Sequence, residues 1–374
     1  MKLRQNNLIP INIPRIGEEE IKAVVRVMSS GQLTNALGAG PTVTHFENSF
    51  AEFAGVKHAI AVNTGTAALH SALVAAGVKR GDEVILPSFT FVATVEAVIM
   101  AGGRPVFTDI NPENYHLSPH EIERNLTKNT KAILPVDLYG LPVDIKPIKE
   151  IADEHDLAIV EDAAQAHGAI YSGKPAGAFA DAACWSFYAS KNITTGEGGL
   201  VTTNNDETAE TLRLIRTHGE KTKYASVMLG YNYRMSEIQA AIGMVQLERL
   251  PLFLSRRREN AKRLTKLLAA SDRLKLPEES EEQQHSWYLY TVRLSNATEN
   301  ERNRIVEQLR QKEIGSEVYY ATPVHLMPYY IANFGKHKLP QTEKAAKQVF
   351  SLPIHPGVTK AQIDYIGNAL LELL

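Results

Sequence analysis

Two neighbouring carboxylates and a lysine follow predicted strands in this sequence. Glu161 and Asp162 come directly after the apolar run 157–160, and Lys191 follows a second apolar run at 184–187. Open α/β sheets place their ligands at the carboxyl ends of their strands, so these side chains are expected at one edge of a sheet. A lysine in a partly desolvated site can have its pKa lowered enough to act as a nucleophilic amine. The pattern therefore predicts a lysine that forms a Schiff base near a carboxylate.

Two further segments supply what a phosphorylated aromatic ligand needs. Residues 63–68, Asn-Thr-Gly-Thr-Ala-Ala, follow a predicted strand and open a predicted helix, where small residues let backbone N–H groups close around a phosphate. Phe89 and Phe91 follow another predicted strand and suit stacking on a planar ring. Phosphate cradle, aromatic plate, carboxylate and lysine together describe a site for pyridoxal phosphate (PLP). Asp162 would keep the pyridine nitrogen protonated, which makes the ring an electron sink.

Each of these signals also has an ordinary structural interpretation. An isolated loop lysine such as Lys191 is most often a solvated surface group, and phenylalanines are usually core residues. Asp162 with Gln165 three residues later fits the capping box of a helix. The segment 63–68 alone is typical of a strand-to-helix turn, and the glycine-rich segment 196–199 is a turn or an incomplete dinucleotide fingerprint. Because a predicted strand and not a helix follows 196–199, nicotinamide binding is disfavoured.

Several long motifs, taken together and in order, are more specific than any one of them. From about Pro10 to the C-terminus the sequence resembles the DegT/DnrJ/EryC/StrS family of sugar aminotransferases, which have fold type I of the PLP enzymes. The runs that carry the resemblance are NTGTAAL, GDEVILPSFTFVAT, VEDAAQAHGA, SFYASKN, GEGG and GYNYRMSEIQAAIG.

The resemblance implies a role for each residue that contacts the cofactor ring. Lys191 would form the internal aldimine and then move the proton between the two carbons of the ketimine. Asp162 would be the partner of the pyridine nitrogen, and Gln165 would contact the phenolic oxygen of the ring. Phe91 would stack on the ring, with Phe89 as the alternative.

The resemblance also implies how the phosphate is held and how the chain assembles. Gly65, Thr66 and Ser186 would hold the phosphate. Asn232, in the run GYNYR, would reach it from the other subunit of a homodimer, because the family is described with its active site at a dimer interface.

The amino acceptor and donor follow from the resemblance as well. It implies a nucleotide-linked keto-sugar as acceptor, with a 4-keto-6-deoxy sugar favoured by the GYNYR-type motif, and L-glutamate, or L-glutamine, as donor. In the C-terminal part, Tyr319 and His325 belong to an aromatic and imidazole cluster, and the family contributes a similar histidine to the sugar site. Both are predicted to bind substrate.

Other functions on the same fold stay open. The family contains dehydratases and regulatory or non-aminating members in which the lysine is replaced, commonly by histidine, so the presence of Lys191 favours transamination. The alternatives are a PLP-dependent sugar dehydratase and a non-catalytic PLP-binding regulator with a preserved site. A nucleotide-sugar oxidoreductase is disfavoured because the dinucleotide fingerprint is incomplete.

Two further features have a structural and a functional interpretation. Basic residues outnumber acidic ones in the segment 249–266, which is typical of a solvated helix face, although one or two of its arginines would suit a nucleotide diphosphate. His167, inside the Asp162 motif, is expected to support its loop through a hydrogen bond and not to act as a base.

The elements that must position these residues form an alternating pattern of strands and helices. This pattern predicts an α/β fold whose large domain, residues 1–250, has a mainly parallel seven-stranded sheet, with a smaller C-terminal α/β domain over 251–374. Pro251 is expected to start a new helix or to kink the helical pattern that begins near Ser236. The predicted strands are 58–62, 83–86, 105–108, 132–135, 158–161, 183–187, 200–203 and, in the smaller domain, 287–294. The predicted helices are 66–76, 93–101, 145–155, 207–217, 299–312 and 360–373.

Length, composition and charge limit the remaining classes. The chain has 374 residues, 40 Lys and Arg against 42 Asp and Glu, a formal net charge of −2 and one cysteine. This charge gives no global attraction to nucleic acid or to an anionic membrane. Cys184 alone cannot form an internal disulfide or a cysteine-based zinc cluster, and no metal site is predicted. The start of the chain lacks the apolar core of a signal peptide, which indicates a cytoplasmic protein.

Overall fold

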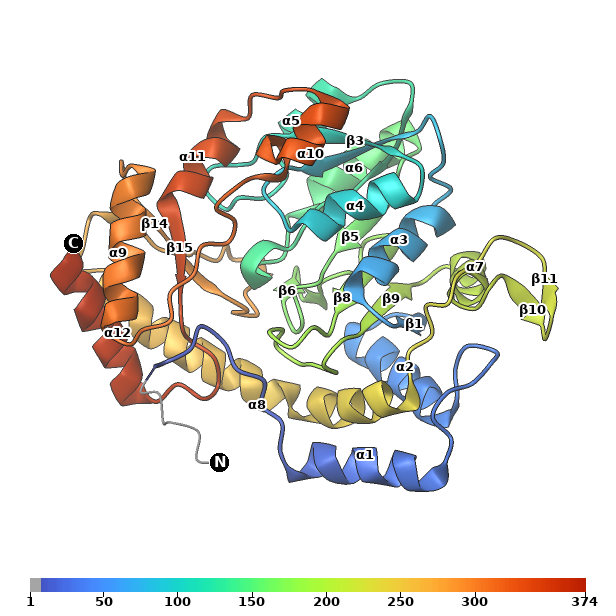
Figure 1. Ribbon diagram of the computed structural model, residues 1–374. Coiled ribbons are helices and arrows are strands. Elements are labelled where there is room, and N and C mark those ends of the chain that lie inside the picture. The colour runs from blue at the N-terminus through green and yellow to red at the C-terminus, as the bar shows by residue number, and fades with distance from the viewer. Residues whose placement is uncertain (1–7) are drawn as a thin grey trace.

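The centre of the computed structural model, which describes residues 8–374, is a seven-stranded sheet (Figure 1). Its strand order is β1-β9-β8-β5-β4-β2-β3, and neighbouring strands are parallel except where β9 pairs with β1 and β8. The α/β fold class with a mainly parallel seven-stranded sheet is therefore confirmed. Every strand predicted for the large domain is present, with ends shifted by at most two residues: β1 (His58–Val62), β2 (Glu83–Pro87), β3 (Arg104–Thr108), β4 (Thr130–Ile133), β5 (Ala158–Asp162), β8 (Ala182–Ser186) and β9 (Gly199–Thr203).

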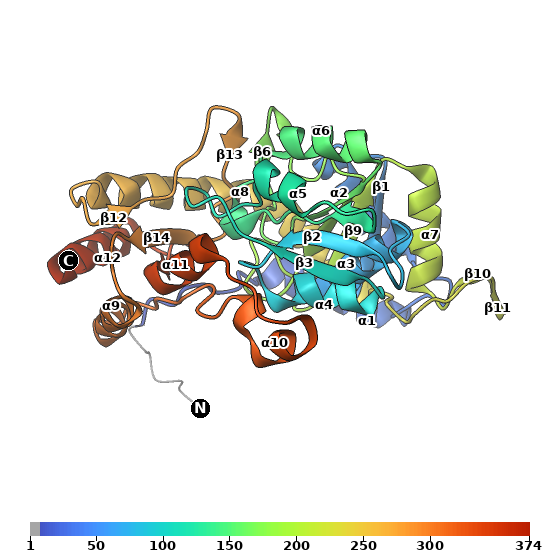
Figure 2. The ribbon, with the colours of Figure 1, turned by 90° about the horizontal axis from the view of Figure 1, so that it is seen from above.

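Helices cover both faces of this sheet, and Figure 2 shows α4 and α6 on opposite sides of it. Alternate strand residues face the two covers: Val160 packs in the core that includes α3, α4 and α7, whereas Ile159 packs in the core that includes α5 and α6. A sheet buried on both faces explains why its strands read as continuous apolar runs. The covering helices are α2 (Pro41–Ala54), α3 (Gly65–Ala75), α4 (Val92–Met100), α5 (Pro119–Asn125), α6 (Ile145–His155) and α7 (Asp206–Arg216).

A single long helix, α8 (Glu237–Leu268), passes under the sheet and continues into the C-terminal part (Figure 1). Ser236 and Gln239 form a capping box that fixes its start. The expectation that Pro251 starts a new helix is wrong, because the helix runs through it. Leu250 and Phe253 are buried on either side of the proline, and their packing holds the chain helical despite the missing N–H.

The C-terminal part forms its own core around a three-stranded sheet of order β12-β14-β15. Its elements are β12 (Leu274–Lys275), β14 (Tyr290–Leu294), α9 (Glu299–Gln311), β15 (Val349–Leu352) and α12 (Lys360–Leu373). The strand expected from Trp287 begins only at Tyr290, because Trp287 has the left-handed φ of 54°. The predicted boundary after residue 250 falls inside α8, and Ile9 joins the C-terminal core. The division into 1–250 and 251–374 stays a prediction.

The remaining elements lie around these two cores. The two-stranded β10-β11 hairpin stands out from the body of the molecule in both ribbon views (Figures 1 and 2). The other elements are α1 (Glu18–Ser30), the 3₁₀ turns η1 (Leu138–Gly140) and η2 (Val324–Leu326), β6 (Ile170–Tyr171), β7 (Lys174–Pro175), β10 (Glu220–Thr222), β11 (Ala225–Ser226), β13 (Gln283–Gln284), α10 (Pro328–Phe334) and α11 (Pro340–Gln348).

The single cysteine is buried, and the described helices differ from a membrane span in length or hydropathy. Cys184, on β8, is 1% exposed and packs in the core beside the site described below. Among residues 8–374, no helix combines the length and the apolar character that crossing a bilayer requires. The first residues, on which the expectation of no signal peptide partly rests, lie outside the described range.

Candidate active site

Asp162 ends β5 at the carboxyl edge of the sheet and is 5% exposed. Its Oδ2 accepts a hydrogen bond of 2.7 Å from the hydroxyl of Thr94 on α4, and its Oδ1 accepts one of 3.2 Å from the backbone N–H of Ala164. Burial raises the pKa of this carboxyl, while the Thr94 hydroxyl and the charge of Lys191 act in the opposite direction. No helix begins here, because residues 163–168 form turns, so the capping-box interpretation of Asp162 and Gln165 is wrong.

Lys191 lies in the loop that follows β8, as its predicted role requires. Its backbone N–H donates to the carbonyl of Tyr188 at 2.9 Å, which closes a turn just beyond the strand. The Nζ atom lies 4.8 Å from the ring centroid of Tyr288, whose hydroxyl is 3.0 Å from the Oγ of Ser190. The lysine is half-buried, and its charge acts on Asp162, so the structure brings the predicted amine and carboxylate into one site.

Gln165 and the two phenylalanines have different surroundings. The Oε1 of Gln165 accepts the N–H of Tyr139 at 2.7 Å, and its Nε2 donates to the hydroxyl of Tyr320 at 3.3 Å. Phe89 is 1% exposed and belongs to the core, whereas Phe91 is 55% exposed, with its ring centroid 6.1 Å from that of Tyr320. Of the two aromatic candidates, Phe91 is therefore the one that offers a face to a ligand.

The first turn of α3 and the end of β8 form a narrow cradle. Thr64 caps the helix by accepting the N–H of Ala67, which leaves the N–H groups of Gly65 and Thr66 without intrahelical acceptors. A Cβ atom on Gly65 would lie 2.7 Å from the Cβ and 3.0 Å from the Oγ of Ser186. This close approach explains the glycine, and the donors gathered here suit an anion.

Asn232 lies at the surface near this cradle in its own chain. Its side chain is exposed, and its carbonyl oxygen accepts a hydrogen bond of 3.2 Å from the Nδ2 of Asn63. Its contact with the phosphate of a second subunit stays a prediction.

The two residues predicted to bind substrate are both held by neighbours. His325 is 0% exposed; its Nδ1 lies 2.7 Å from the Oγ of Ser88, and its Nε2 lies 3.7 Å from a carboxylate oxygen of Glu343. The ring is buried in this chain, and its contact with substrate stays a prediction. Tyr319 is partly exposed, and its carbonyl accepts a hydrogen bond from the hydroxyl of Tyr139, so its side chain is the better placed of the two.

The structure adds contacts that the motifs did not single out. Thr94, Tyr288 and Tyr320 touch Asp162, Lys191 and Gln165, respectively. Thr94 lies inside one of the family motifs, but its role depends on a contact between a helix and a strand that spacing does not reveal. Tyr288 comes from the C-terminal half of the chain, where no motif signals it, and Tyr320 is the neighbour of Tyr319 in the predicted aromatic and imidazole cluster.

His167 does not make the side-chain hydrogen bond that we expected. Both ring nitrogens lack a partner among residues 8–374, and the ring packs against Phe50, Trp185 and Phe187. Burial, with a contribution from the charge of Lys191, lowers the pKa of this histidine to about 3. Because the described part of the chain offers its nitrogens no polar partner, this ring supports its loop by packing and not by hydrogen bonding.

The basic segment 249–266 lies on α8 and is largely paired with this chain itself. Arg249 contacts Glu20 at 2.5 Å, and Arg263 binds Asp364 through two contacts of 2.5 and 2.6 Å. Arg257 is 2% exposed and donates to the carbonyls of Trp287 and Tyr288 at 3.0 and 3.1 Å. These contacts favour the structural interpretation of the segment over the diphosphate one.

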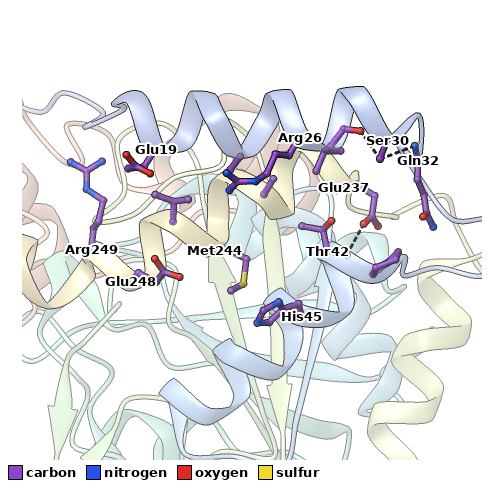
Figure 3. Close-up of a pocket in the computed structure, with 15 residues that line it drawn as sticks. Glu19, Arg26, Ser30, Gln32, Thr42, His45, Glu237, Met244, Glu248 and Arg249 are labelled. Atoms are coloured by element: carbon purple, nitrogen blue, oxygen red, sulfur yellow. Dashed lines mark hydrogen bonds between the residues drawn. The ribbon is translucent and has the colours of Figure 1, made fainter.

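A groove of about 610 Å³ lies elsewhere, between α1, α2 and α8 (Figure 3). Acidic and basic side chains line it together, among them Arg26, Glu237 and Glu248, and Glu237 accepts the N–H of Thr42 at 2.7 Å. None of the residues predicted for the cofactor or the substrate lines this groove. The candidate active site is therefore the carboxyl edge of the sheet and not this groove.

A buried aspartate and a lysine at the carboxyl edge of a mainly parallel sheet, beside a glycine-bearing helix start, define a transferase of fold type I. The sequence model of the DegT/DnrJ/EryC1/StrS aminotransferase family matches residues 14–371, and the chain belongs to this family of PLP-dependent sugar aminotransferases.

Individual proteins support the same placement. The chain is 40% identical to GDP-perosamine synthase of Caulobacter vibrioides, with 98% of each chain covered. It is 39% identical to the pleiotropic regulatory protein of Geobacillus stearothermophilus, with 95% of each covered. Among solved structures it is similar to S. venezuelae DesV in complex with a ketimine intermediate, with a TM-score of 0.90, 36% identity and coverage of 97% of this chain and 98% of that one.

Proposed function

We propose that this chain binds PLP at the carboxyl edge of its sheet and transfers an amino group from L-glutamate to a nucleotide-linked keto-sugar. The observation that carries the proposal is the buried carboxylate of Asp162, which is held by two hydrogen bonds and lies within the electrostatic reach of Lys191. A buried carboxylate fixed in this way suits a protonated ring nitrogen. When bound, PLP supplies an electron sink for carbon–hydrogen bond cleavage next to nitrogen.

Each residue of the site has a task that its surroundings support. Asp162 would hold a proton at the ring nitrogen, and Gln165 would contact the ring oxygen with an amide that Tyr139 and Tyr320 fix. The N–H groups of Gly65 and Thr66 and the hydroxyl of Ser186 would bind the phosphate, while Phe91 would cover the ring. The amine of Lys191 would bind the cofactor and move the proton between the two carbons that exchange oxidation state.

The substrates follow from the family and from the relatives. The name GDP-perosamine synthase, which the Caulobacter relative carries, supports a nucleotide-linked sugar, and we propose a 4-keto-6-deoxy sugar as the acceptor. Tyr319, at the rim formed by the C-terminal part, is the side chain that we assign to this substrate. L-glutamate is the donor that the family favours.

We further propose that the active unit is a homodimer in the cytoplasm, with Asn232 of each subunit contacting the phosphate bound by the other. The exposed side chain of Asn232 supports this assembly, as do the apolar side chains of Tyr224 and Leu229, which are 85% and 74% exposed on and after the protruding hairpin. Covering them would remove apolar surface from water.

Two half-reactions test the proposed function. The purified enzyme loaded with PLP should release 2-oxoglutarate when L-glutamate is added, and its visible absorbance band should disappear. Adding a panel of 4-keto and 3-keto nucleotide sugars should then restore the band, fastest with a 4-keto-6-deoxy sugar. Cofactor binding without any release of 2-oxoglutarate would overturn the aminotransferase assignment.

The same assay separates the second candidate function. The Geobacillus relative is named a pleiotropic regulatory protein, which favours a regulator with a preserved site as the alternative. A regulator would show the visible band but no half-reaction with any donor. A dehydratase would consume a keto-sugar nucleotide without forming 2-oxoglutarate from glutamate.

A further inference from the structure

Two more carboxyl groups are buried directly behind Asp162. Glu161, the preceding residue on β5, is 2% exposed, and Asp137, in the segment that follows β4, is 0% exposed. The two side chains lie close enough to form a hydrogen bond with one another when one of them carries a proton. Successive strand residues point to opposite faces of a sheet, so Glu161 lies on the face away from the side chain of Asp162.

Among residues 8–374, hydrogen-bond donors but no cation act on this pair. Asp137 Oδ1 accepts the N–H of Val143 at 2.8 Å, and Glu161 Oε1 accepts the N–H of Gly177 at 2.9 Å. The other oxygen of Asp137 has no donor within residues 8–374, nor does either carboxyl form a salt bridge there. Two ionised carboxylates in contact would have to be buried against their mutual repulsion, and a proton between them removes that cost.

The pair is tied to the candidate active site through the backbone. The N–H of Asp137 donates to the carbonyl of Asp162 at 3.1 Å, and the N–H of Asp162 donates to the carbonyl of Pro135 at 2.9 Å. Two backbone hydrogen bonds, one in each direction, therefore join the segment that carries Asp137 to the end of β5. A change in the charge or the hydrogen bonding of the pair should therefore alter the position of the backbone that carries Asp162.

We propose that Asp137 and Glu161 share a single proton and act as a positioning pair, which fixes the end of β5 and limits the charge behind Asp162 to one negative unit. The role toward the cofactor rests on the proposed function, whereas the shared proton does not. Neither residue touches the reacting atoms.

The surroundings of Asp137 and Glu161 determine the direction in which each pKa is shifted. Burial raises the pKa of Asp137 well above its usual range, and the neighbouring Glu161 carboxylate raises it further. Burial also raises the pKa of Glu161, but its interactions with Asp137 and with the N–H of Gly177 act in the opposite direction, so we assign the proton to Asp137. The other titratable groups that act on the pair are Asp162 and, from β8, the thiol of Cys184.

Infrared spectroscopy of the cofactor-free protein detects directly whether a carboxyl group of the pair is protonated. With ¹³C-labelled aspartate, the wild-type protein should show the carbonyl band of a protonated carboxyl at neutral pH. Asp137→Asn should lose this band, and Glu161→Gln should shift or remove it. Asp162→Asn, and Asp153→Asn at an exposed position, should keep it. A wild-type protein without the band, or a band that survives Asp137→Asn, would overturn the shared proton.

The pH dependence of unfolding provides a second measurement on the same cofactor-free proteins. A carboxyl with a raised pKa in the folded state stabilises the fold at low pH, and this contribution is lost as the pH rises through the raised pKa. Relative to Asp137→Asn, the wild type should therefore lose stability with rising pH, with a slope of one proton. Parallel curves would contradict the proposal. If Asp137→Asn does not fold, Glu161→Gln serves in the same comparison.

A third measurement tests the positioning role in the PLP-loaded enzyme. Each single isosteric variant keeps one negative charge on the pair, so the pH midpoint of the visible cofactor band should stay close to that of the wild type. The double variant Asp137→Asn/Glu161→Gln removes this charge and should shift the midpoint downward, because a negative charge favours the protonated chromophore. If the double variant shows the same pH midpoint as the wild type, the charge-limiting role is refuted while the proposed function stands. If the wild-type enzyme shows no visible cofactor band, the proposed function itself is refuted.

Discussion

The carboxylate of Asp162 is held by a hydroxyl and a backbone N–H, and the nearest cation in its electrostatic environment is the lysine of the same site. This arrangement leaves the negative charge of the aspartate available to a ligand, since within residues 8–374 no arginine or second lysine neutralises it. Replacing the carboxylate by an isosteric amide keeps the shape and removes the charge, so it isolates the electrostatic contribution.

Asp162→Asn should bind PLP but lose most of the turnover rate. A neutral amide cannot hold a proton at the ring nitrogen, and we expect a loss on the order of 10²-fold to 10⁴-fold, the range typical of acid–base contributions. Stopped-flow measurement of the half-reaction with L-glutamate checks this prediction. A wild-type rate would mean that Asp162 is not the partner of the ring nitrogen.

Lys191→Ala should abolish both turnover and the visible absorbance of the bound cofactor, because no other amine is expected to take its place. The absorbance spectrum and the release of 2-oxoglutarate are the two measurements. Lys174→Ala, which removes an exposed lysine packed on Phe179, is the matched control and should leave both unchanged. Full activity of Lys191→Ala would refute the proposed mechanism.

At the scale of single elements, the start of α3 depends on one glycine. In Gly65→Ala, the new Cβ would lie 2.7 Å from the Cβ of Ser186, which forces the helix start away from β8. We expect the affinity for PLP to fall by about tenfold or more, since about 1.4 kcal/mol corresponds to a factor of ten. Equilibrium titration with PLP measures it. Gly17→Ala, where a Cβ meets only ordinary contacts at 3.5 and 3.7 Å, is the control.

The helix α8 carries a proline in its interior. Pro251→Ala restores one backbone N–H donor, and we expect a gain in the free energy of unfolding of about 1 kcal/mol or more, because an interior proline costs a helix roughly 3 kcal/mol and part of this is offset in the unfolded chain. Chemical denaturation measures the change. A loss of stability would indicate that the chain around Pro251 is adapted to the proline ring.

The sequence predicts the elements of this protein better than it predicts the contacts between them. The strands and most helices follow from apolar runs and their boundaries, and the lysine and aspartate follow from their places after two strands. The burial of His325 and the contact of Thr94 with Asp162 depend on how helices and loops pack on the sheet. The spacing of residues along the chain does not predict this packing. Trp287 shows the same limit at the backbone level, since its left-handed φ of 54° delays a strand that its side chain alone would favour.

For the molecule as a whole, buried uncharged histidines make the fold sensitive to acid. Burial lowers the pKa of His116 and His355 to about 4 and that of His167 and His285 to about 3. A group with a depressed pKa in the folded state stabilises the fold above its unfolded pKa of about 6.5, and this contribution is lost as the pH falls toward the folded value. Each ring therefore favours unfolding as the solution is acidified below about pH 6.5.

His167→Leu should reduce the loss of folding stability on acidification. Apart from a packing cost that does not depend on pH, the variant should gain stability relative to the wild type between pH 6.5 and pH 5, by on the order of 2 kcal/mol. Denaturation at several pH values measures the difference. His120→Gln, at a side chain that is 79% exposed, is the control and should follow the wild-type curve. A constant difference between His167→Leu and the wild type across this range would contradict the prediction.

The unbroken course of α8 has a mechanical consequence. The helix begins beside the loop that carries Asn232 and ends in the core of the C-terminal part, and at 32 residues it spans about 48 Å. A rod of this length couples the two regions it joins, so the C-terminal part cannot swing open as a free lobe on a flexible joint. We therefore expect any movement that admits a bulky ligand to the sheet edge to occur in short rim segments, such as the one that holds Tyr319, and not at a hinge between lobes.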